Sequence, residues 1–268
     1  MITVVALRGG ALVVDGGARA GHASLEGGAF DDRALARANR ALGNPWWQRA
    51  VEVLLGPITL QSEEEITIAS AGGADVDVIT VAAGGSVVLR PSSLRMVVAV
   101  RGGLALAPGT ALATGDRVPL ARAASSAAHI DDDDDGDGPI RVVAGAERDR
   151  FDVDALALLC ARAWTVDPRS SRLGIRLQGD ALPVPAGGVD VVTRGAWTGG
   201  VQVLPSGLPL VLGVDQRRTG GYARLAHVIS VDRHRLAQLR PGHETRFVEV
   251  ELPRARELRR ARAQRWSC

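Results

Sequence analysis

The first part of the chain alternates short apolar runs with turn residues. Ile2–Leu7, Ile66–Ser70 and Arg95–Val100 are the clearest runs, and Gly, Pro and Ser lie between them. Runs of this length that recur roughly every ten residues predict the β-strands of a barrel or sandwich. Further strands of the same kind are predicted over residues 11–14, 51–55, 58–61, 76–81 and 86–90.

The second part of the chain has the same organisation, with a few helices. Helical spacing of apolar residues predicts a helix over 153–163, and another over 33–42 in the first part, capped by Asp31 or Asp32. Asp232 is expected to cap a short third helix. The predicted fold class is therefore mainly β with a few helices. Strands are predicted over residues 140–144, 174–177, 189–192, 201–204, 208–214, 225–231 and 245–252.

An acidic stretch divides the chain. Asp131–Asp135 is an unbroken run of aspartates, and such a run repels itself and resists burial. Residues 121–139 are therefore predicted to link an N-terminal β-barrel domain (1–120) to a C-terminal one (140–252). The alternative is a calcium loop, which the lack of EF-hand ligand spacing disfavours.

Residues 253–268 form an arginine-rich tail in which Glu257 is the one acid. Such a tail can grip RNA or a membrane surface. The favoured alternative is a solvated terminal helix that frays or packs on the acidic linker.

The composition excludes several classes of function. The net charge of +2 is too small to indicate a nucleic-acid-binding protein. Cys160 and Cys268 are the only cysteines, so a disulfide framework and a metal finger are excluded, and the five histidines show no metal spacing. No lysine is present, which excludes a Schiff-base mechanism. No signal peptide or membrane-length apolar run is visible, so a cytoplasmic location without membrane contact is expected.

The segment 199–229 carries the most specific signal. A predicted hairpin with a Pro205-Ser206-Gly207 turn ends at Asp215, and arginines, two glycines and Tyr222 follow. Glycines let backbone N–H groups approach an anion, and arginine offers a planar fork to carboxylate or phosphate. The pattern indicates a ligand loop at the end of a buried strand. The ordinary alternative is a turn in which Asp215 bonds its own backbone.

This segment resembles the carboxyltransferase A/B family, which includes the C-type subunit of 5-oxoprolinase, the Kip A antagonist, the second subunit of allophanate hydrolase and urea carboxylase. The family pattern "D-Q-T-GGYPK" is matched by Asp215 and Thr219-Gly220-Gly221-Tyr222, and "PGD" by Pro241-Gly242. Weaker matches lie upstream. They are Ser170–Gly179 for "SDRMGYRL-G", Gly27–Asp31 for "GGAMD", Ala38-Asn39 with Gly43-Asn44-Pro45, and Val51-Glu52-Val53.

The resemblance implies a site in the second domain. Asp215 and Arg224 are the expected catalytic residues, with Asp215 as base, water-orienting group or holder of a metal–nucleotide. Expected substrate-binding residues are Gln202, Arg218, Thr219, Gly220, Gly221, Tyr222 and Asn39. Backbone N–H groups of Thr219-Gly220-Gly221 would form an anion nest, the alternative being a tight turn.

The resemblance also implies a tandem of cyclophilin-like barrels and a role as subunit of an ATP-dependent amide or lactam hydrolase. ATP and Mg are the implied cofactors, and no biotin attachment site lies in this chain. The implied partners are a B-type (Kip I-like) barrel protein and an A-type lactam-utilisation subunit. The alternatives are a catalytically degenerate Kip A-like regulator and a biotin-dependent carboxyltransferase-like domain.

Three departures from the family pattern qualify this expectation. Arg194 replaces the acid of "SEP", Arg224 replaces the lysine after "GGYP", and a loop shrinks to 108–115. The loss of polar ligand residues is compatible with a family member that keeps the fold and loses the reaction.

Overall fold

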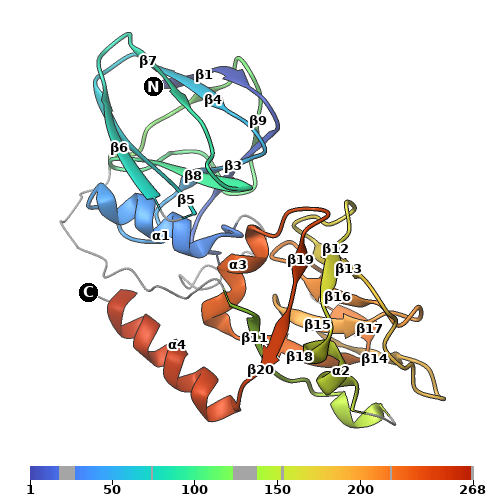
Figure 1. Ribbon diagram of the computed structural model, residues 1–268. Coiled ribbons are helices and arrows are strands. Elements are labelled where there is room, and N and C mark those ends of the chain that lie inside the picture. Colours follow the sequence, from blue (N-terminus) through green and yellow to red (C-terminus); the bar gives the residue numbers. More distant parts are fainter. Residues whose placement is uncertain (18–27, 74, 123–137, 152–153, 218, 267–268) are drawn as a thin grey trace. The chain divides into compact units, whose positions relative to one another are not determined.

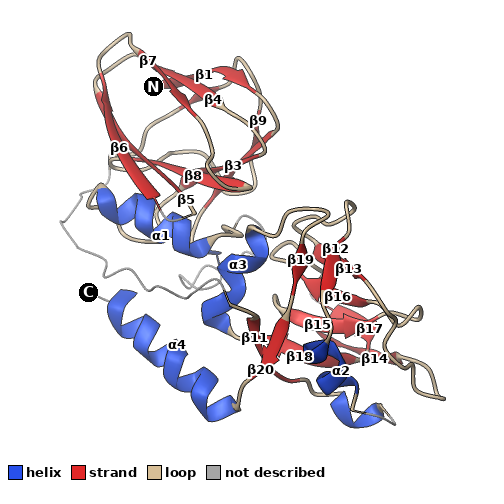
Figure 2. Cartoon of the chain, in the orientation of Figure 1, coloured by secondary structure: helices blue, strands red, loops and turns tan. Residues whose placement is uncertain are grey.

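Strands dominate both halves of the chain, and helices are few (Figure 2). The computed structural model describes all residues except 18–27, 74, 123–137, 152–153, 218 and 267–268. The chain divides into two units, residues 1–132 and 133–267 (Figure 1). The mainly-β fold class is confirmed. Most of the expected linker, including the aspartate run, lies outside the described residues.

Two sheets build the first unit. One has the strand order β10-β1-β4-β7 and the other β6-β5-β8-β3-β2-β9, with antiparallel pairing in each. The strands are β1 (Ile2–Leu7), β2 (Gly10–Val14), β3 (Ala50–Leu54), β4 (Ile58–Ser62), β5 (Ile66–Gly72), β6 (Asp75–Val81), β7 (Ser86–Leu89), β8 (Arg95–Val100), β9 (Ala111–Leu112) and β10 (Arg117–Val118).

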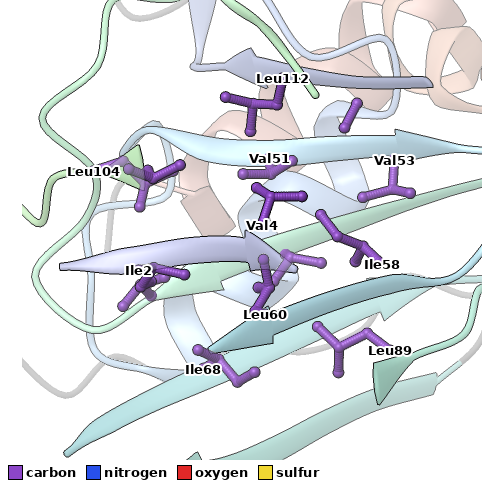
Figure 3. Packing of buried hydrophobic residues seen from close by; sticks show 14 of the residues in the cluster. Ile2, Val4, Val51, Val53, Ile58, Leu60, Ile68, Leu89, Leu104 and Leu112 are labelled. Atoms are coloured by element: carbon purple, nitrogen blue, oxygen red, sulfur yellow. The ribbon is translucent and has the colours of Figure 1, made fainter. Parts of the chain in front are cut away.

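Aliphatic side chains from both sheets meet in one core (Figure 3). Along β1, Ile2 and Val4 are buried while Val5 is exposed, which is the alternation of a strand with one face in the core. Ile58 of the paired strand β4 and Ile68 of β5, which belongs to the other sheet, are fully buried in the same cluster. Since aromatic residues are 3% of the chain, Val, Leu and Ile supply almost all of this packing.

The helix α1 (Asp32–Ala41) covers the outer face of β5 and β8. Leu35 and Ala38 pack there against Val97 and other small residues of the two strands. This second contact explains why every residue of β8 is buried: alternate side chains enter the barrel core or the helix interface. The Asp31 carboxylate accepts from the Ala34 N–H at 2.8 Å, so the predicted cap is confirmed.

The second unit is one large sheet with a two-stranded ribbon. The sheet order is β19-β12-β13-β16-β15-β18-β11-β20, and the ribbon pairs β14 with β17. The strands are β11 (Ile140–Ala144), β12 (Trp164–Val166), β13 (Gly174–Gln178), β14 (Asp190–Gly195), β15 (Gly200–Val203), β16 (Pro209–Leu212), β17 (Thr219–Tyr222), β18 (Arg224–Val228), β19 (Glu244–Thr245) and β20 (Phe247–Glu249). The helical elements are η2 (Arg148–Arg150), α2 (Ala155–Ala161), η3 (Ser230–Asp232), α3 (Arg233–Ala237) and α4 (Leu252–Trp266).

The structure corrects the expected role of Asp232. Its carboxylate makes no capping bond to α3, because η3 runs directly into that helix and gives Asp232 helical dihedral angles. The carboxylate, which is fully buried, accepts instead from the backbone N–H and the guanidinium of Arg141. A predicted helix cap is thus a buried ion pair that ties β11 to η3.

The arginine-rich tail is the helix α4, and it packs on the second unit (Figure 1). The Arg262 guanidinium is buried and donates to the carbonyl of Val231 at 3.0 Å. It also lies 4.7 Å from the Trp266 ring, in a cation–π contact. Among the described residues no helix is both long and apolar enough to cross a bilayer.

Truncating a core isoleucine should destabilise the first unit strongly. Ile58→Ala leaves a cavity between the sheets, and we expect a loss of about 2–5 kcal/mol in the free energy of unfolding. Urea unfolding followed by circular dichroism measures the change. Val88→Ala on the neighbouring β7 is the control, because Val88 is half-exposed and the expected loss is about 0.5 kcal/mol or less. Equal losses in the two variants would contradict the assignment of this core.

Candidate functional site

The family motifs of the second unit lie at the ends of three strands of one sheet, with Arg172 and Asp215 at one end and Arg224 at the opposite end, so the expected convergence of Asp215 and Arg224 on one ligand is not found. Arg172 precedes β13, Asp215 follows β16, and Arg224 begins β18. In the sheet β13 pairs with β16, β16 with β15, and β15 with β18. Each side chain is therefore placed by a strand of the same sheet.

Asp215 is held by Arg172 in a two-pronged ion pair. Arg172 Nε lies 2.7 Å from Asp215 Oδ2, and Arg172 Nη2 lies 3.0 Å from Oδ1. The Asp215 backbone N–H also donates to the Arg172 carbonyl at 3.1 Å. Asp215 keeps 31% of its side chain exposed, so the pair is fixed in orientation and still reachable from solvent.

Close backbone contacts fix the loops around this pair. Gly213 donates its N–H to the Leu173 carbonyl, and its own carbonyl accepts from the Thr198 hydroxyl. A Cβ at Gly213 would come 2.0 Å from the Arg172 carbonyl oxygen, so only glycine fits there. The loops that carry Arg172, Asp215 and Thr198 are therefore locked together.

The stretch Thr219–Tyr222 is a strand, which corrects the expected anion nest. Gly220 pairs with Arg194 and Thr219 with Gly195 across the β14–β17 ribbon. Neither Gly220 nor Gly221 has a positive φ, so the alternation of right- and left-handed residues that forms a nest is absent from this segment. The segment pairs with β14 along the ribbon.

Gln202 and Gly220 are matched in shape. Gln202 is buried on β15, and its Nε2 lies 3.5 Å from the Tyr222 carbonyl oxygen. A Cβ at Gly220 would approach Gln202 Nε2 to 2.6 Å. The glycine therefore makes room for the amide, and three of the expected binding residues do lie together. Tyr222 itself is half-buried.

Arg224 is engaged by Glu147, a residue that no sequence pattern indicated. Arg224 Nε and Nη2 donate to the two Glu147 oxygens at 2.8 and 2.7 Å, and the Arg224 backbone N–H donates at 3.1 Å. Arg194 Nη1 lies 3.6 Å from the same carboxylate. The hydrogen bond from Arg224 holds the pKa of Glu147 below its ordinary value, despite burial. Both substituted family positions, 194 and 224, thus meet at one carboxylate.

His227 lies further along the same strand. Arg233 Nη2 is 3.1 Å from His227 Nε2, which accepts when the ring is neutral. Burial, aided by the charges of Arg233 and Arg224, lowers the pKa of His227 to about 4. The ring is therefore neutral at physiological pH.

Asn39 is part of the first unit and has structural contacts. It is fully buried on α1, and its Nδ2 donates to the Gln48 carbonyl at 2.7 Å. Its Oδ1 accepts from Asn44 Nδ2 at 3.0 Å, and Asn44 in turn bonds the Val100 carbonyl. These bonds hold the loop after α1 against β8. Ligand binding by Asn39 stays a prediction, as it does for Arg218, which lies outside the described residues.

Two residues of this site carried little or no signal in the sequence alone. Arg172 lies inside the "SDRMG" match, so the motif itself was the available signal. Glu147 follows Gly145 in an irregular turn, and only the folded chain brings it to β18. A Cβ at Gly145 would lie 2.1 Å from the Arg224 carbonyl oxygen, which shows how closely the two segments pack.

Binding of ATP and Mg by this chain stays a prediction. Within the described ranges no group of three or more His, Cys, Asp or Glu residues is placed to hold a metal ion. The carboxylates of Asp215 and Glu147 are both committed to arginine forks. At one end of the sheet Asp215 is an oriented carboxylate, which suits proton transfer. At the other end the guanidinium of Arg194, beside Glu147, suits anion binding.

Comparison with known proteins extends these matches over most of the chain. The family model for the carboxyltransferase domain, subdomains A and B, matches residues 25–108 and 90–249. The C-type subunit of 5-oxoprolinase from Haemophilus influenzae is 30% identical over 269 residues, covering 87% of this chain and 85% of the relative. The corresponding 5-oxoprolinase chain of Escherichia coli is 29% identical with the same coverage.

Solved structures are also similar to this chain over most of its length. TTHA0988 is 28% identical, with a TM-score of 0.76 over 92% of this chain, and the match spans 55% of that longer protein. The urea amidolyase of K. lactis is 20% identical with a TM-score of 0.82, over 99% of this chain and 20% of the enzyme, which supports the fold alone.

Removing the Glu147 carboxylate should destabilise the second unit at neutral pH. Glu147→Gln leaves the Arg224 guanidinium without its counter-ion, and we expect a loss of about 1–3 kcal/mol at pH 7. The extra stability of the wild type over Glu147→Gln is fully present above pH 4.5, the ordinary pKa of a glutamate. It is lost as the pH falls through the lowered pKa of Glu147 in the folded protein. Chemical unfolding across this range checks it. Glu257→Gln on the surface of α4 is the control, and a pH-independent loss would contradict the prediction.

His227 should make stability depend on pH at milder acidity. The unfolded ring takes up a proton near pH 6.5, whereas the folded ring does so at about 4, so acidification through this window favours unfolding. We expect His227→Gln to flatten this slope, by up to about 3 kcal/mol across the window. Urea midpoints measured between these pH values test it, with the exposed His243→Gln as control. An unchanged slope in His227→Gln would show that other groups cause it.

Proposed function

Because the chain belongs to the carboxyltransferase domain family of subdomains A and B, we propose that it is the C-type subunit of an ATP-dependent amide hydrolase acting on a small lactam such as 5-oxoproline. The observation that carries the proposal is the match to the C-type subunits of two bacterial 5-oxoprolinases, which spans 85% of their own length. Since both relatives are subunits, the match supports partner chains for this protein as well.

The partners are proposed to be a B-type barrel protein and an A-type lactam-utilisation subunit. The solved relative TTHA0988 supports a partner, because this chain matches only 55% of its length. A chain that corresponds to part of a longer protein is expected to work with the counterpart of the rest. We assign the nucleotide to such a partner, because Asp215 and Glu147, the carboxylates beside the family motifs, are each held by an arginine fork.

Within the assembly, Asp215 is the proposed proton acceptor. Its exposed edge faces solvent while Arg172 fixes its plane, so it can orient a water toward a bound carbonyl. Arg172 is then a positioning residue. Arg224 was expected to be catalytic, but its fork with Glu147 leaves it better suited to hold β18 and the turn 145–147 in place.

A second candidate is a regulator of the Kip A antagonist type. The observation that favours it is the engagement of Arg224 by Glu147, which takes a family cation out of the site. Such a chain would bind the B-type partner without supporting turnover.

One assay distinguishes the hydrolase subunit from the regulator. It measures ATP-dependent release of glutamate from 5-oxoproline by the chain copurified with its partners. Asp215→Asn should lower kcat by about 10²–10⁴-fold while the complex still assembles. Arg172→Gln should lower kcat less than Asp215→Asn and leave KM nearly unchanged, because the carboxylate remains but loses its fixed orientation.

Arg240→Gln, an exposed arginine outside the site, should leave the rate unchanged. Turnover that persists undiminished in Asp215→Asn would refute its role. A stable complex with no turnover in the wild type would favour the regulator.

A further inference from the structure

A pocket that includes Glu147 and Arg194, but not the Arg172–Asp215 pair, lies beside the β14–β17 ribbon. It has a volume of about 350 Å³ and is formed by the turn around η2 on one side and β14 on the other. Its lining includes Glu147, Asp149, Arg150, Val191, Val192 and Arg194. Asp215, Arg172 and Gln202 do not line it.

The arginine side chains around this pocket have more hydrogen-bond donors than its acids use. Glu147 at its base is already satisfied by Arg224, which donates three N–H groups to the two carboxylate oxygens. Arg194 adds only one contact, at 3.6 Å, and keeps 62% of its side chain exposed. Within the part of the chain that the structure describes, Glu147 is the one acid that forms an ion pair with Arg194, so this guanidinium has donors to spare.

The second arginine of the pocket is similarly available. Arg150 donates one N–H, to the Asp190 carbonyl at 3.2 Å, and its side chain is otherwise exposed. This bond brings Arg150 to the start of β14, the strand that carries Arg194. Two guanidinium groups therefore reach the same pocket from its opposite walls, a combination that suits a carboxylate.

The remaining lining limits the size and charge of a ligand. Val191 and Val192 give an apolar wall, and Val192 is 80% exposed, which is unusual for a valine in a strand. Asp149 adds one negative charge, which would oppose a dianion such as a phosphate more than a single carboxylate. The ligand that suits this lining is a small molecule with one carboxylate and an apolar side.

We propose that this pocket binds a small organic monocarboxylate, with the carboxylate between Arg194 and Arg150 and the apolar part on Val191 and Val192. Binding requires only that Arg194 turn from its 3.6 Å contact, because Glu147 keeps its fork with Arg224. 5-Oxoproline has this chemistry, and its choice as probe is the one point that rests on the proposed function. Since Arg194 pairs with Gly220 across the ribbon, an occupied pocket would adjoin the glycine motif.

Calorimetric titration of the full chain with 5-oxo-L-proline tests the pocket directly. Saturable binding is expected for 5-oxoproline and none for 2-pyrrolidinone, which has the same ring without the carboxylate. Arg194→Gln and Arg150→Gln should each weaken binding by about tenfold or more, since each removes a charge-assisted hydrogen bond. Arg240→Gln is the matched arginine control, and circular dichroism confirms that the variants fold.

Three results would overturn the proposal: no heat with 5-oxoproline, equal binding of 2-pyrrolidinone, or unchanged affinity in Arg194→Gln. The titration needs neither ATP nor a partner, so its outcome is separate from that of the hydrolysis assay. Binding without turnover in the assembled complex would reject the proposed function alone. Turnover in the assembled complex together with unchanged 5-oxoproline affinity in Arg194→Gln would reject the pocket alone.

Discussion

Bidentate pairing of arginine with carboxylate is the interaction on which the second unit depends. Arg172–Asp215, Arg224–Glu147 and Arg141–Asp232 each join segments that are far apart in the sequence. Arg169 adds a local pair with the buried Asp167, whose carboxyl pKa it holds well below the ordinary value. In a chain without lysine, the planar guanidinium supplies every such contact, and its fork fixes orientation as well as distance. These forks tie the segments that carry the motifs to distant parts of the second unit.

Both units combine buried aliphatic residues with buried polar groups. The first has an aliphatic core between its sheets and a helix packed on the outside. Its buried Asn39 and Asn44 bond to backbone carbonyls and to each other, and Arg95 forms a buried ion pair with Glu52. The second unit buries Val142, Leu156 and other aliphatic residues, and its Asp232 has a fully buried carboxylate.

Alternation and turn residues were sufficient to predict most strands, and the cap at Asp31 followed from its position before an apolar helix. The errors have a common cause. Asp232 looks like a cap in sequence, but Arg141, which is 91 positions away, takes its carboxylate. Thr219–Tyr222 looks like a loop because glycine is a weak strand former, yet pairing with β14 overrides that preference. Glu147 carries no local pattern at all, because its importance arises only when β18 and the turn before η2 meet.

The tight backbone contacts around the motif loops determine how this region can respond to a ligand. At Gly213 and Gly145 a neighbouring carbonyl oxygen is so near that no side chain fits there. Because main chain packs on main chain at these points, we expect adaptation to a ligand to come mainly from rotation of long side chains such as that of Arg194. Recognition would then consist of rotamer changes on a rigid frame, fast on the scale of backbone rearrangement and sensitive to the loss of a single side chain.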